Sequence, residues 1–365
     1  MFVLRKIGSI CSLCTVVLVA RLPGQKDSQK AHSKSELSGN ADEERVTLVL
    51  HATFDRVGTK LIPQVDNWEG PISLAVVFPE EDDETTKNRV FCSAQKLKAL
   101  RESNRNVTQR LSVHFVIPTS SRICVDDGEI ASAAGECRTS QRVLSEDEAI
   151  EALVRYPINV ARNLARKMVH SRYTLIADLD HLFSVDFESK MAQLARSSLA
   201  ENPKLALVYR IFEVDHDADL KALFDAKRAS VFHHEWHGHH IRGLDEWFAT
   251  EEHDAASIQF VQEYNVTDWE PQFVSESSTI PEHDESFFYP AADNTVLRWE
   301  MCRSGFEFAV VNDVFMFHHG RKSGNERKLV DNARFRVKEE TLAAKNVFRK
   351  RMSEKFPESS GKCGF

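Results

Sequence analysis

The sequence predicts an α/β fold with a mostly parallel central sheet and helices on both faces. Short apolar segments rich in β-branched residues alternate with a segment of helical character, which is typical of parallel sheets with covering helices. In chain order these segments are a strand at Arg45–His51, a strand at Ile72–Phe78, a helix at Ser93–Leu100 and a strand at Leu111–Ile117. A further apolar strand, Tyr173–Ala177, contains no Pro or Gly and is predicted to be buried in the same sheet.

The remaining elements continue this alternation. A long helix is predicted from Ser145 to Val169, opened by a capping box between Ser145 and Glu148 and interrupted at Pro157. The later predicted elements are a helix at Phe187–Ala200, a strand at Leu205–Phe212, a helix at Asp217–Ala229, a strand–turn–strand unit at Phe308–Phe317 and a basic amphipathic helix at Glu339–Phe356. The simplest division is one domain over residues 45–357, followed by a tail at 358–365.

The composition is that of a globular protein and argues against a nucleic-acid partner. Of the 365 residues, 42% are hydrophobic and 28% are charged, which suits one large α/β domain or two small ones. The formal charge is -8, whereas binding to a phosphate backbone requires a basic surface. We therefore expect no nucleic acid among the partners.

The N-terminus predicts entry into the secretory pathway. Arg5 and Lys6 precede an uncharged segment, Ile7–Ala20, that is short for a spanning helix and of ordinary length for a signal-peptide core. Residues 1–22 are interpreted as a signal-anchor or a cleaved signal peptide, and residues 23–44, which lack aromatic side chains, as a flexible stem. An anchor would make a single-pass type II membrane protein with a lumenal domain, and a cleaved signal would give a secreted one.

Cysteines and sequons agree with a lumenal domain. An oxidising lumen favours disulfides, and we expect a bridge between Cys124 and Cys137 because it closes a short loop. At least one of the cysteines beyond the N-terminal segment is left over, because their number is odd. Glycosylation sequons occur at Asn106 and Asn265.

Two carboxylates, Asp178 and Asp180, follow the strand Tyr173–Ala177. Open α/β sheets bind ligands at the carboxyl ends of their strands, and an Asp-x-Asp pair there can hold a hard divalent cation that neutralises a diphosphate. Asp is also common in the solvated turns that follow strands. The pair therefore predicts either a metal–diphosphate site or two turn acids.

Two stretches are rich in histidine. Residues 233–240, HHEWHGHH, miss the zinc-protease pattern because Gly238 stands where the second ligating histidine is needed. They are interpreted as a loop that contacts a sugar or phosphate, or as a polar surface loop. His318 and His319 follow an apolar strand, where one histidine can complete an Asp/Asp/His metal site; a structural or exposed role is the alternative.

Two loops, Trp269–Pro271 and Ile280–Phe287, combine aromatic rings with carboxylates. Sugars are bound by stacking on aromatic rings and by carboxylates that accept hydrogen bonds from hydroxyl groups. This composition favours a glycan acceptor site. An acidic surface loop with a buried Phe287 explains it equally well.

Ordered blocks of the sequence resemble glycosyltransferase family 49. The blocks are LVLHATFDR, WEGPISLAV, YPINVARNLA, YTLIADLD, LALVYRIFE, the HGHH segment ending at Trp247, WEPQFV, IPEHDESF and GFEFAVVNDVFMFHHG, and they extend from Val46 to Pro357. The resemblance implies a GT-A-type fold in a Golgi membrane protein of type II topology. It also implies inverting transfer from a UDP-sugar, with glucuronic acid as one candidate, to a glycan or glycoprotein, using manganese or magnesium.

The resemblance further implies roles for individual residues. It assigns metal binding to Asp178, Asp180 and His318, with Asp178 also supporting the nucleotide. The other residues that it implies in nucleotide or donor binding are Asn159, Arg162, Asn163 and Asn294.

The resemblance implies Asp284 as an acceptor-binding group or as the base that takes the acceptor proton, and the neighbouring Glu285 is the alternative base. The sequence departs from the family pattern nearby. The loop Tyr289–Asn294 lacks the expected glycines, and His283 and Ser286 replace a tyrosine and an arginine. The sequence therefore leaves two alternative functions: a metal-dependent Golgi glycosyltransferase, or a non-catalytic glycan-binding relative with an altered donor loop.

Overall fold

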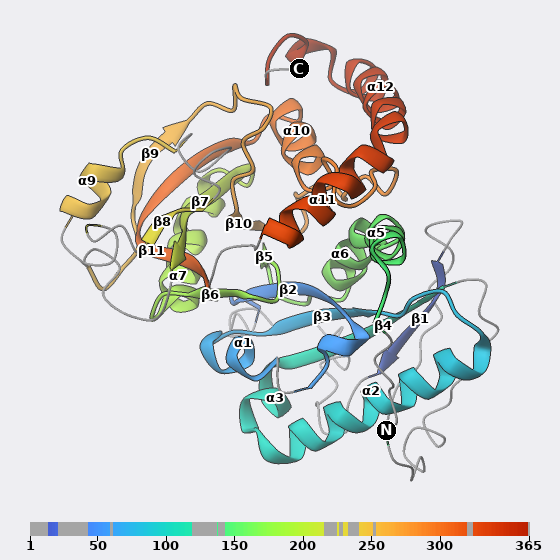
Figure 1. Cartoon of the computed structure of the whole chain (residues 1–365). Helices are drawn as coiled ribbons and strands as arrows, with labels where there is room; N and C mark the ends of the chain where they lie inside the picture. Colours follow the sequence, from blue (N-terminus) through green and yellow to red (C-terminus); the bar gives the residue numbers. More distant parts are fainter. Residues whose placement is uncertain are drawn as a thin grey trace, which may run out of the picture.

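Figure 1 shows the computed structural model of the chain. It describes residues 14–20, 43–58, 61–118, 137, 143–214, 225, 229–232, 241–250, 253–319 and 324–363, with backbone alone at 14–20 and at 319. Its strands are β1 (Cys14–Ala20), β2 (Val46–Thr53), β3 (Ile72–Val77), β4 (Leu111–Pro118), β5 (Tyr173–Ile176), β6 (His181–Phe183), β7 (Leu205–Val214), β8 (Ala229–Val231), β9 (Ile258–Gln262), β10 (Phe273–Glu276) and β11 (Glu307–His319).

These strands form one mixed sheet. Its order is β1-β4-β3-β2-β5-β10-β7-β11-β6, with β8 paired to β7 and β9 paired to β11. Neighbours are parallel from β4 through β3 and β2 to β5, and again between β7 and β11. β10 lies antiparallel between β5 and β7. The predicted α/β class is confirmed, with a parallel half on the β2 side and a mixed half on the β7 side.

Helices cover both faces of the sheet, and Figure 1 shows α1, α2 and α3 on the opposite side of β2, β3 and β4 from α5 and α6. Their bounds, with those of the later helices, are α1 (Ile62–Asn67), α2 (Asp83–Ser103), α3 (Arg105–Arg110), α5 (Glu146–Val154), α6 (Ile158–Lys167), α7 (Phe187–Glu201), α9 (Leu244–Ala249), α10 (Thr295–Arg303), α11 (Gly324–Arg336) and α12 (Lys338–Lys355).

The core is divided by the sheet because side chains alternate along each strand. Leu48 and Leu50 of β2 pack with residues of α1, α2, α3 and α7. Val49, between them, faces the other way and packs with residues of α6, α10 and α12. Burial on both faces explains why β2 is apolar along most of its length.

Most helix predictions hold, with changes at the ends. The capping box between Ser145 and Glu148 is confirmed, and the helix is divided at Pro157 into α5 and α6. α2 begins earlier than predicted because Asp82 caps it by accepting a hydrogen bond from the Thr85 N–H at 2.9 Å. The helix predicted at Asp217–Ala229 lies mostly outside the described residues, and Ala229 itself begins β8.

The strand–turn–strand unit predicted at Phe308–Phe317 is instead one long strand, β11. Its pairing with β7 shifts register between Val310 and Phe315, and Asp313 has a positive φ of 69°. The apolar residues on both sides of Asp313 pair with the same neighbour, so the polar residues make a bulge where a turn was expected. As a result, β11 continues to His318 at the edge where the predicted site lies.

The apolar N-terminal segment also differs from expectation. Residues Cys14–Ala20 form β1, an edge strand antiparallel to β4, where we expected part of an apolar anchor or signal segment. Threonine and valine favour extended backbone, which accounts for the strand. Among the residues that the structure describes, no helix is long and apolar enough to cross a membrane.

The predicted bridge between Cys124 and Cys137 is wrong, because Cys137 is bonded to Cys92 of α2. The Cα atoms of Cys92 and Cys137 lie 5.2 Å apart, within the range that a disulfide spans. Which cysteines form a disulfide depends on their distance in the folded chain, and their separation in the sequence predicts it less well.

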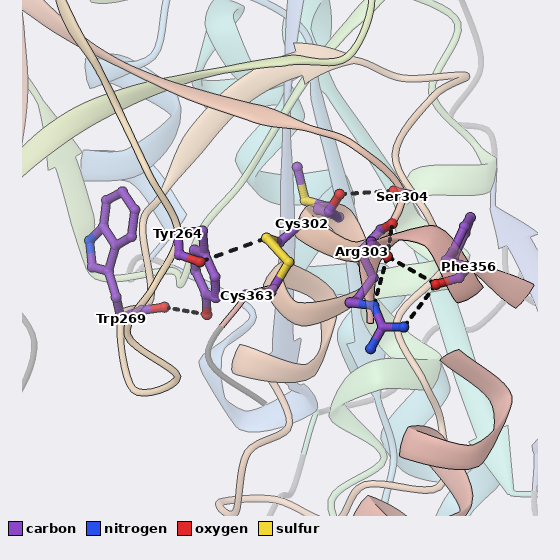
Figure 2. Close-up of a disulfide and its surroundings, with 9 residues drawn as sticks. Tyr264, Trp269, Cys302, Arg303, Ser304, Phe356 and Cys363 are labelled. Carbon is purple, nitrogen blue, oxygen red and sulfur yellow. Dashed lines mark hydrogen bonds between the residues drawn. A yellow bond between two sulfur atoms is a disulfide. The ribbon is translucent and has the colours of Figure 1, made fainter. Parts of the chain in front are cut away.

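A second disulfide fastens the C-terminal tail to α10. It joins Cys302 to Cys363, and Figure 2 shows beside it Arg303, whose guanidinium donates to the carbonyl oxygen of Phe356 at 2.9 Å. The described part of the tail is therefore joined to the domain by a covalent bond and by a buried arginine.

Candidate functional site

The candidate site lies where the strand order reverses. The chain passes from β2 to β3 and β4 on one side, then returns to β5 on the other side of β2. β2 and β5 are parallel, and the N–H of Ala177 donates to the carbonyl oxygen of Val49 at 3.0 Å. The carboxyl ends of both strands meet here, and such a switch point is where open α/β sheets bind ligands.

Asp178, directly after β5, contacts a histidine near the end of β2. Its Oδ1 lies 3.2 Å from Nε2 of His51, and Nδ1 of His51 lies 2.8 Å from the hydroxyl of Tyr156. These partners suit the tautomer in which Nε2–H donates to Asp178 and Tyr156 donates to Nδ1. Burial acts to raise the pKa of Asp178, but the hydrogen bond from His51 and the electrostatic interactions with His181 and Arg162 outweigh it and hold that pKa well below its usual range.

Asp180 and His318 lie together across two strands. Oδ2 of Asp180 is 3.2 Å from Nε2 of His318, which stands opposite His181 in the antiparallel pair of β11 and β6. The Asp180 side chain is 64% exposed. Partial burial acts to raise its pKa, yet the hydrogen bond with His318 and the charge of His181 lower it overall. Asp180 is thus an ionised, accessible carboxylate beside an imidazole.

In the described part of the chain, no three metal donors converge on one point. Asp180 and His318 face each other, whereas Oδ1 of Asp178 faces His51. The side chain of His319 and the histidine-rich residues 233–240 lie outside the described residues, so the expectations for them stay predictions.

Three site residues were missed by reasoning from the sequence: His51, Tyr156 and His181. His51 lies near the end of the strand parallel to β5, and a polar residue at that position is the signal that could have found it. His181 follows Asp180 directly, and its Nδ1 accepts a hydrogen bond from the Asp178 N–H at 3.3 Å. Burial lowers the pKa of His181 although both aspartates oppose this, and its hydrogen bond with the Asp178 N–H orders the turn.

Of the three α6 residues predicted to contact the nucleotide, Arg162 faces the acid pair. One guanidinium nitrogen lies 3.9 Å from Oδ1 of Asp178, and another lies 2.9 Å from Oδ2 of Asp293. Burial raises the pKa of Asp293, and Arg162 counters that rise. Arg162 therefore joins the altered loop to the acid pair, an arrangement that the sequence did not predict.

Asn159 and Asn163 hold a loop in place. The amide of Asn159 donates to the carbonyl oxygen of Asp284 at 2.9 Å, and the amide of Asn163 donates to that of His283 at 2.9 Å. Both asparagines are buried. Asn163 also donates to the Glu285 carboxylate at 3.0 Å and Asn159 accepts from Arg162 at 3.2 Å, so both asparagines support this loop through contacts within the protein.

The two predicted bases differ in their surroundings. Oδ2 of Asp284 is 2.8 Å from a guanidinium nitrogen of Arg351 on α12, and its Oδ1 accepts from the N–H and the hydroxyl of Ser286 at 2.9 and 2.6 Å. Glu285 accepts from Asn163 at 3.0 Å, and burial raises its pKa. Asp284 is thus fixed by neighbours on both oxygens.

Two residues at or near the altered loop are Asn294, which the family pattern keeps, and His283, which departs from it. Asn294 precedes α10, and both its carbonyl and its side-chain oxygen accept hydrogen bonds from Arg298. His283 is buried, and neither ring nitrogen has a hydrogen-bond partner among the described residues. Burial and the charge of Arg162 lower the pKa of His283 well below its usual value, so the ring is neutral.

Solved structures of similar fold are distant. Staphylococcus aureus TarS is 8% identical with a TM-score of 0.37, over 76% of this chain and 37% of that one. GalNAc-T7, solved with UDP, GalNAc and Mn2+, is 10% identical with a TM-score of 0.41, over 80% of this chain and 47% of that one.

Sequence relatives cover much more of the chain. Mouse β-1,4-glucuronyltransferase 1 is 23% identical over 90% of this chain and 80% of its own length. Mouse xylosyl- and glucuronyltransferase LARGE1 is 23% identical over 88% of this chain and 37% of its own length. The model of the family described as "Glycosyl-transferase for dystroglycan" matches residues 45–357. The predicted relationship is thereby confirmed: this chain belongs to glycosyltransferase family 49 and is a glycosyltransferase.

Proposed function

We propose that this glycosyltransferase moves a sugar from a UDP-sugar to a glycan, with inversion and with a divalent cation, in the Golgi lumen. One observation carries the proposal: an ionised carboxylate, Asp180, faces His318 beside a second ionised carboxylate, Asp178, at the switch point between β2 and β5. The relatives named as glucuronyltransferases support glucuronic acid as a candidate donor sugar.

The donor set fits a cation such as Mn2+. Two carboxylates and one imidazole are suitable ligands, and Asp180 and His318 would hold the ion with Asp178 beside them. Bound there, the ion would supply positive charge that stabilises the UDP leaving group. The exposure of Asp180 leaves this pair open to an incoming diphosphate.

Several neighbouring residues hold the groups at this edge of the sheet in position. His51 and Arg162 keep Asp178 ionised and fix its Oδ1, while His181 orders the turn between the two acids. Asn159 and Asn163 hold the loop that carries the two predicted bases. Asp284 is tied to Arg351 and Glu285 accepts a hydrogen bond from Asn163, so both of these acids have partners within the protein.

A second candidate function is glycan binding without catalysis. The loop Tyr289–Asn294 lacks the family's glycines, its Asp293 and Asn294 are engaged by Arg162 and Arg298, and three donors do not converge in the described residues. These features fit a donor site that has lost its metal.

Titration of the purified protein with UDP separates the two functions. The enzyme is expected to bind UDP at least about tenfold more tightly with Mn2+ than with excess EDTA, because an ion held by Asp180 and His318 would supply positive charge to the diphosphate. UDP-sugar turnover should need the ion as well. Metal-independent UDP affinity, or no UDP binding at all, would favour the glycan-binding function.

The lumenal location is proposed from the N-terminal segment together with the disulfides, which form in oxidising compartments. Asn265 is exposed in a loop, whereas the amide of Asn106 donates to Asp66 at 2.9 Å. In animal cells the full chain is expected to carry an N-glycan at Asn265 that Asn265→Gln removes, and to resist carbonate extraction if the segment is an anchor. Lack of any glycan on the wild type would argue against a lumenal domain.

A further inference from the structure

A pocket opens between β7 and the segment Trp269–Gln272. It has about 540 Å³ of empty space, part of it open to solvent. The residues that matter for its chemistry are Arg210, Phe232, Ile241, Leu244, Glu270 and Gln272.

The pocket borders the Asp180–His318 pair through one aromatic ring. The Phe232 ring centroid lies 5.9 Å from that of His318 and 5.8 Å from that of His181. The pocket is built on β7, in the mixed half of the sheet, whereas Asp178 adjoins β2 and β5 of the parallel half. In the sheet order β7 stands between β5 and β11, so the pocket lies between the switch point and the Asp180–His318 pair.

Its walls are apolar and its polar groups are fixed. Phe232, Ile241 and Leu244 supply hydrocarbon surface, which suits the C–H faces of a sugar ring. Arg210 is 3% exposed, and its terminal nitrogens donate to the carbonyl oxygens of Ile241 and Arg242 at 3.2 and 2.6 Å. Its buried Nε has no hydrogen-bond partner among the described residues.

Glu270 is the carboxylate of this pocket. One oxygen, Oε1, accepts from the hydroxyl of Thr295 at 2.8 Å, which orients the group. The preceding residue is anchored too, because the carbonyl oxygen of Trp269 accepts from the Tyr264 hydroxyl at 2.8 Å, and the Tyr264 carbonyl oxygen lies 3.7 Å from Sγ of Cys302 (Figure 2). The loop that carries Glu270 thus contacts α10 at both Thr295 and Cys302.

We propose that this pocket binds a terminal neutral pyranose of the glycan acceptor, and that Glu270 takes the proton from its attacking hydroxyl. This inference rests on the proposed function. An inverting displacement needs the nucleophile next to the anomeric carbon and opposite the leaving group, and the pocket borders the Asp180–His318 pair, between it and the switch point assigned to UDP. The acceptor oxygen bonds to the anomeric carbon, the bond from that carbon to the diphosphate oxygen breaks with its electrons leaving on UDP, and the hydroxyl proton passes to Glu270.

Glu270→Gln tests the base. The probes are UDP-glucuronic acid with the methyl β-glycosides of xylose, glucose and galactose, and the readout is acceptor-dependent release of UDP. The variant is expected to lose at least about 100-fold in rate and the acidic limb of its pH profile, while UDP affinity with Mn2+ is retained. Asp268→Asn, on an exposed neighbour in the same loop, is the matched control and should behave as wild type. A variant that keeps the wild-type rate overturns the role of Glu270.

Leu244→Trp tests the pocket without any need for turnover. The three glycosides are measured for binding by saturation-transfer NMR, both without nucleotide and with UDP and Mn2+. The wild type is expected to bind at least one, and the tryptophan, which fills the pocket, should weaken that binding at least about tenfold while UDP still binds. Absence of glycoside binding to the wild type, or equal binding to the variant, overturns the assignment. Failure of UDP binding alone would instead count against the proposed function.

Discussion

Replacing Asp180 with asparagine is expected to lower sugar transfer on the order of 10³-fold. The substitution keeps the shape of the side chain and an oxygen that can face His318, which lies 3.2 Å away. It removes the negative charge that would hold a cation at the leaving group. Because the Asp180 side chain is 64% exposed, the free energy of unfolding should change little.

Turnover of a UDP-sugar measured against Mn2+ concentration checks this expectation. The variant should need more metal for half-maximal rate and should bind UDP more weakly in its presence, with an unchanged thermal unfolding midpoint. Asp331→Asn, an equally exposed aspartate on α11, is the matched control. Wild-type turnover by the Asp180 variant, or turnover that persists in excess EDTA, would remove the metal from the proposed mechanism.

The sequence could predict the site residues that directly follow an apolar strand. Asp178 and Asp180 stand directly after an apolar segment, and the family resemblance identified His318 at the end of another. The structure brings Asp180 and His318 into contact because β6 and β11 are paired antiparallel, with His181 opposite His318. The ends of strands can thus be located from the local sequence pattern. The family resemblance indicated which residues at these ends form one site.

The local sequence pattern could not predict contacts between segments that are far apart in the sequence. Asp293 was noticed only as part of an altered loop, and nothing in the spacing of residues indicates that it meets Arg162. The family resemblance implied Asp284 as a base or an acceptor-binding group, yet its carboxylate forms an ion pair with Arg351 of α12. The composition of Trp269–Pro271 favoured a glycan acceptor site, but it did not indicate the pocket around Glu270, which is formed with β7 and the residues around Phe232.

Arg162→Met is expected to lower the free energy of unfolding by about 3–5 kcal/mol, since it removes one partner of a buried ion pair. The Arg162 and Asp293 side chains are 6% and 11% exposed, with 2.9 Å between their charged atoms. Methionine preserves much of the side-chain volume, so the loss reports the charge rather than a cavity. Arg155→Met, which breaks an exposed pair with Glu151 on α5, is the matched control and should leave stability nearly unchanged.

The dependence of this loss on pH identifies Asp293 as its cause. Burial already raises the pKa of Asp293 while Arg162 is present, and without Arg162 that pKa rises further. A carboxyl with a raised folded-state pKa contributes stability below its unfolded pKa and loses it as pH rises through the folded one. The deficit of Arg162→Met in urea denaturation should therefore be smaller at acidic than at alkaline pH, and Asp293→Asn added to the same chain should recover most of it. An equal deficit across the pH range, or a double variant no more stable than the single one, would show that Arg162 stabilises the fold through other contacts, such as the one it makes with Asn159 at 3.2 Å.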